Sequence, residues 1–141
     1  MSDYAVTPSG VLSSGVNAGA TNKSGIAGES ITAGQSLYKD ATDGNKMKLS
    51  DANVAAKSKV AGVSLHAALA GQPIQYSESD PNFTPGFNIA AGEVVVASAT
   101  SGGLAPDADA VTGWFKTVMG VGIGNNKMKL GPFIASGAAV A

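Results

Sequence analysis

Short apolar stretches separated by polar turns recur along the chain and predict β-strands. Val94, Val95 and Val96 are all β-branched, and Ala-Gly pairs precede two of the stretches, a composition typical of strands and their turns. Six stretches have this character: Ser30–Tyr38, Ser58–Leu65, Gln72–Tyr76, Glu93–Ser98, Trp114–Ile123 and Lys127–Ile134. No apolar period of 3.6 residues persists long enough to predict a substantial helix. The pattern therefore predicts an all-β protein.

The strand pattern repeats at an offset of 58 residues, which indicates an internal duplication. Residues at equivalent places are identical in the pairs Ile31/Ile89, Ala33/Ala91, Gly34/Gly92, Ala41/Ala99, Thr42/Thr100, Gly44/Gly102, Asp51/Asp109, Ala52/Ala110, Val60/Val118, Gly62/Gly120 and Val63/Val121. Ile, Asp and Val matches count most in a chain rich in Ala and Gly. We expect two similar halves, at about 30–76 and 88–134, that build a small β-barrel or sandwich.

Each half predicts three strands with an irregular connection between the first and the second. The connections are Asp40–Lys57 and Ala99–Gly113, rich in Asp and Ala. Gly62 and Gly120 interrupt the second strands and indicate a bulge or a tight bend. Between the halves, Ser77–Gly86 contains two prolines and polar residues, so we expect a linker there.

Residues 1–28 differ in composition from the remainder. They are rich in Gly, Ser, Ala, Asn and Thr, with isolated apolar residues, and such a segment cannot bury enough apolar surface to offset its own ordering entropy. We expect a flexible or extended N-terminal arm that orders against a neighbouring subunit. Residues 29–141 then form the β-domain.

The apolar content predicts a modest core that gains from association. Hydrophobic residues make up 44% of the chain, but many are Ala and only 6% are aromatic, so each buried side chain contributes little. The chain contains no cysteine, which excludes stabilisation by disulfides. Because association with other chains would add buried surface, we expect a homo-oligomer.

Charge argues against nucleic acid and membrane partners. Charged residues make up 13% of the sequence, the formal net charge is −1, and all nine cationic side chains are lysines. Arginine is the preferred residue for phosphate and base recognition. No apolar run approaches the length of a membrane span, and the sequence begins without the features of a signal peptide. We expect synthesis in a cytoplasm and no membrane or nucleic acid partner.

Side chains with catalytic or metal-binding chemistry are present but dispersed. His66 is the single histidine and no acidic residue lies within ten positions of it, which argues against a metal site or a catalytic triad. Asp40, Asp43 and Asn45 offer oxygen ligands for calcium without the EF-hand spacing. Gly120–Gly124 precedes a turn and a strand instead of the helix that a phosphate-binding loop requires. We expect no catalytic, cofactor or metal site.

Apolar and aromatic residues near the predicted strand ends and in the arm are the candidate protein-interface residues. These are Tyr4, Val11, Leu12, Phe83, Phe87, Trp114 and Phe115. Adjacent residues in a strand face opposite sides, so either Trp114 or Phe115 is expected outside the core. The uncharged run Ile134–Ala141 also suits burial in an interface better than solvation.

Several segments resemble the capsid decoration, or cement, proteins of tailed phages. The segments that carry the resemblance are Ala33–Ala41, Lys48–Asn53, Val60–Leu65, Gly113-Trp114, Val118–Gly122 and Lys129–Gly131. Their pattern is set by Gly and Ala spacing, and it spans about residues 28–137.

The resemblance implies a β-barrel-like fold without enzymatic activity. It also implies a place on the capsid exterior, often as a trimer, bridging neighbouring major capsid subunits. Two alternatives are a tail or fibre component that binds host-surface glycans, with exposed aromatics in a groove, and a small hydrolase dependent on His66.

Overall fold

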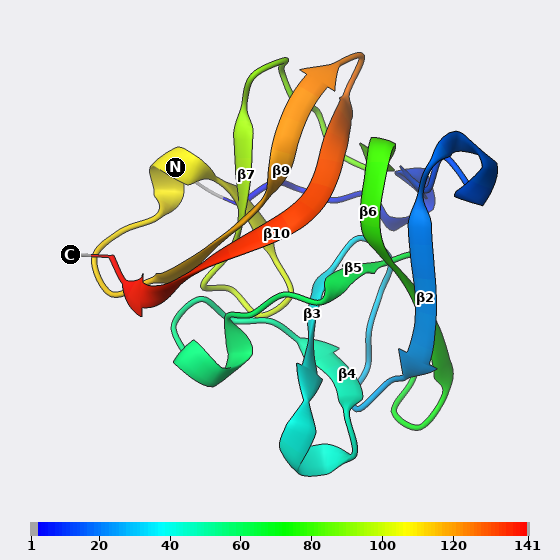
Figure 1. The fold of residues 1–141 in the computed structure, drawn as a ribbon, viewed down its shortest axis with the longest axis vertical. Coiled ribbons are helices and arrows are strands. Elements are labelled where there is room, and N and C mark those ends of the chain that lie inside the picture. The colour runs from blue at the N-terminus through cyan, green and yellow to red at the C-terminus, as the bar shows by residue number, and fades with distance from the viewer. Residues whose placement is uncertain (1–2, 141) are drawn as a thin grey trace.

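The computed structural model describes residues 3–140. The first two residues of the predicted arm and the last residue of the predicted domain lie outside the described residues. A curled antiparallel sheet forms a half-barrel (Figure 1). Its strands are β1 (Val11–Leu12), β2 (Thr21–Ile26), β3 (Ser36–Asp40), β4 (Lys46–Leu49), β5 (Gly62–Ser64), β6 (Pro73–Pro85), β7 (Val94–Ala97), β8 (Leu104–Pro106), β9 (Phe115–Gly124) and β10 (Lys127–Ala139). Short 3₁₀ turns connect them: η1 (Pro8–Gly10), η2 (Val16–Ala18), η3 (Ala41–Asp43), η4 (Ala55–Lys57) and η5 (Asp107–Asp109). The predicted all-β class is confirmed.

The strand order is symmetric about the middle of the sheet, the arrangement that two similar halves would give. The sheet runs β4-β3-β5-β6-β10-β9-β7-β8. Counted from each outer edge inward, the halves follow the equivalent orders β4-β3-β5-β6 and β8-β7-β9-β10, and they meet where β6 pairs with β10. The register also repeats: Leu37 pairs with Gly62 in the first half, and Val95 with Gly120 in the second. Each half thus has four strands in place of the three predicted, because β4 and β8 form hairpins inside the connections.

The two predicted loops after the second strands differ in length between the halves. In the second half Asn125 and Asn126, both with φ of 55°, make the tight turn between β9 and β10, a backbone that asparagine tolerates and that suits a two-residue hairpin. In the first half the longer loop His66–Gly71 connects the equivalent strands, β5 and β6. The third strands of the halves therefore align at a shorter spacing than the offset of 58 residues.

The predicted linker Ser77–Gly86 is mostly strand. β6 continues from Pro73 to Pro85 without interruption, and its backbone pairs with β1, β2, β5 and β10. Pairing with so many neighbours outweighs the weak strand propensity of the prolines and polar residues. The segment joins the halves by being the central strand of the sheet.

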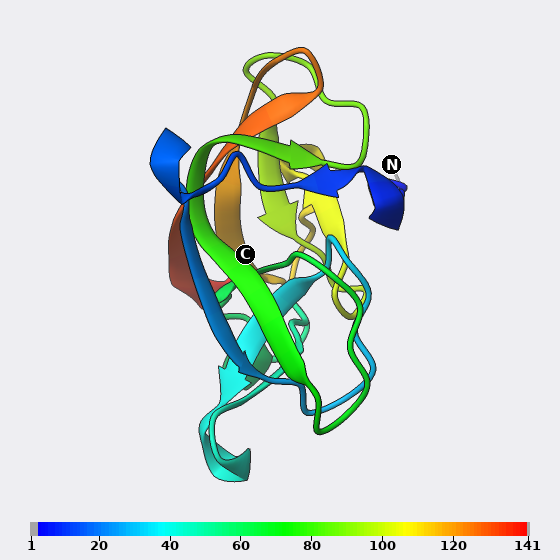
Figure 2. The same cartoon turned by 90° about the vertical axis from the view of Figure 1, so that its right-hand side faces the viewer.

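The N-terminal segment belongs to the same sheet. β2 pairs with β6 from Thr21 to Ile26, and β1 pairs with its C-terminal end. Figure 2 shows this segment running along β6 over its whole length. The segment therefore pairs with a strand of its own chain. This differs from the expected arm that becomes ordered by binding to a neighbouring subunit.

The buried side chains form two separate clusters. The larger cluster contains Val63, Phe83, Phe87, Ile89, Val95, Ala97, Leu104, Met119, Met128 and Leu130. The smaller cluster contains Ala27, Ile31, Leu37, Met47, Ala68, Ile74 and Tyr76. Neither core is large, in agreement with the apolar content of the sequence.

Two glycines mark places where strands pass too closely for a side chain. A Cβ at Gly120 would overlap the carbonyl oxygen of Lys129, and one at Gly62 would overlap the ring of Tyr76. The predicted bulge lies beside Gly120, where the register between β7 and β9 shifts. At both positions close approach of a neighbouring strand is what requires glycine.

Candidate functional site

The seven predicted interface residues divide between the core and the surface. Phe83 is fully buried and Phe87 is 8% exposed, both within the larger cluster. For these two residues a surface role is wrong, because β6 and the loop after it turn their rings inward. Tyr4 and Val11 also pack against that cluster, while remaining partly exposed.

Tyr4 attaches the N-terminal segment to the second half of the molecule. Its ring stacks on Phe87 with centroids 4.1 Å apart, and its hydroxyl donates a hydrogen bond of 2.6 Å to the Glu93 carboxylate. Burial raises the pKa of Tyr4 above its usual range, and the hydrogen bond to Glu93 raises it further. The same bond, together with one from the Ala90 N–H, lowers the pKa of Glu93. Tyr4 is thus used within its own chain.

The other three residues keep accessible surface. Leu12 is 65% exposed, whereas Trp114 and Phe115 are each half-buried at the start of β9. Backbone bonds hold this start in place: Phe115 N donates to Ala52 O, and Val140 N donates to Trp114 O.

Four of the most exposed apolar side chains lie near the two ends of the chain or beside them, and we name the two pairs by their position in the sequence. The N-terminal apolar surface consists of Leu12 in β1 and Val16 in η2, which is 70% exposed. The C-terminal apolar surface consists of Ile134 in β10, 62% exposed, and Val111 beside the end of that strand, where Gly113 N donates to Val140 O. In Figure 1, η2 (dark blue) and the end of β10 (red) lie on opposite sides of the molecule.

Sequence reasoning found only part of these surfaces. It singled out Leu12, the other isolated apolar residues of the arm such as Val16, and the uncharged run from Ile134, but it missed Val111 as a contact candidate. Isolated valines in polar segments carry no signal that separates exposed from buried positions.

One edge of β10 is free as well as uncharged. β9 pairs with β10 as far as Ala139, but β6 pairs with it only as far as Leu130. Within residues 3–140 no strand pairs with the second edge of β10 after Leu130. From Leu130 onward the sequence contains no charged residue, although exposed strand edges are usually protected by charge.

Two of the three candidate calcium ligands, Asp40 and Asp43, form ion pairs with lysines. Lys48 Nζ lies 2.8 Å from an Asp40 oxygen and 3.0 Å from an Asp43 oxygen, and Lys46 Nζ lies 3.6 Å from Asp43. The bond from Lys48, supported by the Thr42 hydroxyl, lowers the pKa of Asp40 to about 2. A lysine ammonium thus supplies the positive charge that these carboxylates would otherwise take from a cation.

His66 bonds to backbone groups. Its Nδ1 lies 2.9 Å from Ala67 O, and its Nε2 lies 3.0 Å from the Gln75 nitrogen. With Gln75 N–H as donor, Nε2 accepts and Nδ1 donates, so the ring closes the loop between β5 and β6. Among the described residues no group of three His, Asp or Glu side chains is placed to hold a metal ion.

Comparisons with protein-family models, with curated proteins and with solved structures gave no match to this chain. In the part of the chain that the structure describes, no helix has the length and apolarity to cross a membrane.

Proposed function

We propose that this protein is a head decoration, or cement, protein of a tailed phage that binds the outer surface of the capsid. In this role it bridges neighbouring major capsid subunits and stabilises the shell without performing a reaction. The sequence resemblance motivates the proposal. The duplicated all-β fold and the distribution of exposed apolar residues support it.

The observation that carries the proposal is that η2 and the end of β10 lie on opposite sides of one small molecule (Figure 1), and that exposed apolar side chains belong to or adjoin both. Leu12 and Val16 in the N-terminal segment, and Val111 and Ile134 in the C-terminal part of the chain, are between 57% and 70% exposed. Exposed apolar side chains of this size lose unfavourable contact with water when a partner covers them. Two such sites on opposite sides allow one protomer to contact two neighbours at once.

The free edge of β10 adds a second kind of contact. A strand edge with unpaired N–H and C=O groups accepts a further strand, whose backbone bonds give affinity while side chains give specificity. Since Ile134 and Ala139 carry no charge, a partner strand would meet no electrostatic barrier there.

Oligomerisation follows from the same features. The two core clusters are small and separate, so surface buried between protomers would add the stability that each protomer lacks. We propose a homo-oligomer, with a trimer favoured by the resemblance. Several modest contacts to capsid subunits then combine into strong overall binding.

The test is reconstitution on phage heads that lack this protein. Purified protein is mixed with such heads, sedimented with them, and visualised with a tagged version in electron micrographs. We expect saturable binding to the head surface and a higher temperature of head disruption. Heads that bind none of it and gain no heat resistance, or label found on the tail instead, would refute the proposal.

A further inference from the structure

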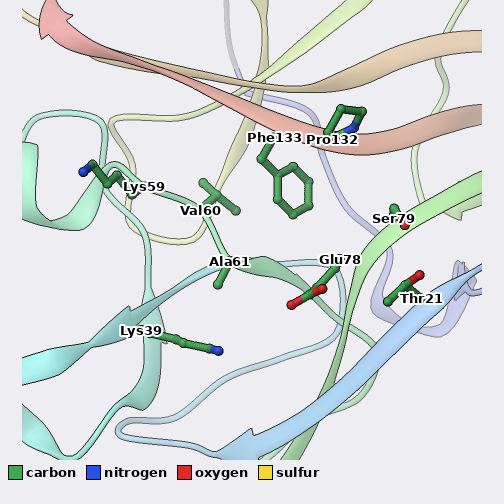
Figure 3. Close-up of a pocket in the computed structure, with 9 residues that line it drawn as sticks. All are labelled: Thr21, Lys39, Lys59, Val60, Ala61, Glu78, Ser79, Pro132 and Phe133. Carbon is green, nitrogen blue, oxygen red and sulfur yellow. The ribbon is translucent and has the colours of Figure 1, made fainter.

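A cleft of about 600 Å³ opens at the seam between the two halves. β5 pairs with β6 at Ser77, and β10 pairs with β6 at Asp80. Between these positions, Glu78 and Ser79 pair with neither β5 nor β10, so the sheet separates there. Figure 3 shows β10 on one side of the opening and the segment that leads into β5 on the other.

One wall of the cleft is apolar and firmly supported. The ring of Phe133 extends from β10 into the opening and lies near Val60 (Figure 3). Both side chains are half-buried and also pack against the larger core cluster. An aromatic ring held by the core can receive a ligand with little loss of side-chain entropy.

The opposite wall is polar and contains both donors and acceptors. Lys39 from β3 and Glu78 from β6 point toward one another in Figure 3. Among the residues that the structure describes, Lys39 forms no ion pair, whereas Glu78 is held by Lys23 at 3.6 Å. Thr21 and Ser79 add two hydroxyls to the lining.

We propose that this cleft binds a short saccharide. A sugar ring presents C–H groups on its face, which fit the ring of Phe133, and hydroxyls on its edge, which both donate and accept. Those hydroxyls would accept from the Lys39 ammonium and donate to the Glu78 carboxylate, in charge-assisted bonds that are stronger than neutral ones. The volume lies within the ordinary range of small-ligand sites.

Other ligand classes fit the two walls less well. A wholly apolar ligand would remove water from Lys39 and Glu78 without offering them a partner, which costs free energy. A compact anion would face the Glu78 carboxylate and leave Phe133 unused. A ligand with an apolar face, and with hydroxyls that both donate and accept hydrogen bonds, satisfies all of these groups.

Saccharide binding goes beyond capsid decoration and does not depend on it. Phe133 and Ile134 are neighbours in β10, so they point to opposite faces of the strand. A partner seated on Ile134 would therefore leave the cleft accessible, and a protein fixed to a capsid could still present it to sugars outside the particle.

The experiment is an NMR titration of the full ¹⁵N-labelled chain. The probes are the methyl glycosides of glucose, galactose, mannose, rhamnose and N-acetylglucosamine, with acetate and a hexa-aspartate peptide as anionic probes. We expect at least one glycoside to shift the amide signals of Lys39, Ala61, Glu78 and Phe133 saturably, with a Kd of about 1 mM. The anionic probes are expected to leave these signals in place.

Variants separate binding from folding. Phe133→Ala and Glu78→Gln should each weaken binding about fivefold or more, equivalent to about 1 kcal/mol. Ile134→Ala, the adjacent residue outside the cleft, should bind as the parent does. If Phe133→Ala fails to fold, Glu78→Gln still tests whether the cleft binds the saccharide. No shift with any glycoside, shifts that both variants retain, or stronger binding of the anionic probes would each overturn the proposal.

Discussion

The buried carboxylate of Asp80 binds both polar groups of Ser14. It accepts hydrogen bonds from the Ser14 N–H at 2.7 Å and from the Ser14 hydroxyl, and Asn82 N donates a third at 2.9 Å. Asp80 is fully buried in β6, and Ser14 lies between β1 and β2. This contact holds the N-terminal segment against the central strand of the sheet.

Removing this carboxylate should loosen the N-terminal segment. In Asp80→Ala the Ser14 and Asn82 N–H groups lose their acceptor, so we expect a loss of about 3 kcal/mol in the free energy of unfolding. Ser14→Ala removes only the hydroxyl and should cost about 1 kcal/mol. Urea denaturation measures both, and hydrogen exchange of residues 11–26 should accelerate in Asp80→Ala. Unchanged exchange in that segment would contradict the role assigned to Asp80.

Gly120 should tolerate no side chain. Because an added methyl group would overlap the backbone of β10, Gly120→Ala should lower the free energy of unfolding by about 2 kcal/mol or more. Gly25→Ala is the matched control, since its Cβ would approach the Met47 side chain at 3.2 Å and the Tyr76 ring at 3.8 Å without overlapping any backbone atom, and we expect a change below about 1 kcal/mol. Equal effects of the two substitutions would show that close strand approach is not the cause.

Lys48 should control the titration of Asp40. In Lys48→Met the pKa of Asp40 should rise from about 2 toward its ordinary value, because the ammonium that lowers it is gone. A carboxylate with a lowered folded pKa stabilises the fold above its unfolded pKa, and this contribution disappears as pH falls through the folded pKa. The stability difference between the parent and Lys48→Met should therefore close between about pH 4 and pH 2. Carboxyl ¹³C NMR measures the pKa, and Lys39→Met serves as the control without effect on it.

Tyr4→Phe should separate the hydroxyl of Tyr4 from its ring. The ring stack on Phe87 persists, whereas the bond to Glu93 is lost, so we expect a cost of about 1 kcal/mol near neutral pH. Tyr4→Ala also loses the stack and should cost about 2 kcal/mol or more. The pKa of Glu93 should rise in both variants, since the Tyr4 bond is the main cause of its lowering. The advantage of the parent over Tyr4→Phe should accordingly fade in acid, as thermal unfolding across the pH range would show.

The apolar surfaces should matter for binding to heads and not for folding. Leu12→Asp and Ile134→Asp change side chains that are 65% and 62% exposed, so the free energy of unfolding should change by less than about 0.5 kcal/mol. Binding to heads should fall at least tenfold in the double variant. Leu69→Asp, equally exposed at 63% in the loop before β6, should bind normally. If the double variant binds heads as well as Leu69→Asp does, the two surfaces are not the contact sites.

Much of the fold was predictable from the sequence because it depends on local composition and on duplication. β-branched runs such as Val94–Val96 predicted strands, and the repeat predicted two similar halves. The loss of charge after Lys129 marked the C-terminal strand as an interaction candidate. These features are carried by neighbouring residues, so they survive without knowledge of the partners in space.

Tertiary structure alone decided the rest, because strand pairing joins residues far apart in sequence. Pairing along both edges turned the proline-containing stretch after Tyr76 into the central strand and drew Thr21–Ile26 into the sheet. The same pairing buried Phe83 and Phe87, which composition could not distinguish from surface aromatics such as Trp114. The cleft beside Phe133 exists only because β5 and β10 separate along β6, and no local pattern records where two distant strands part.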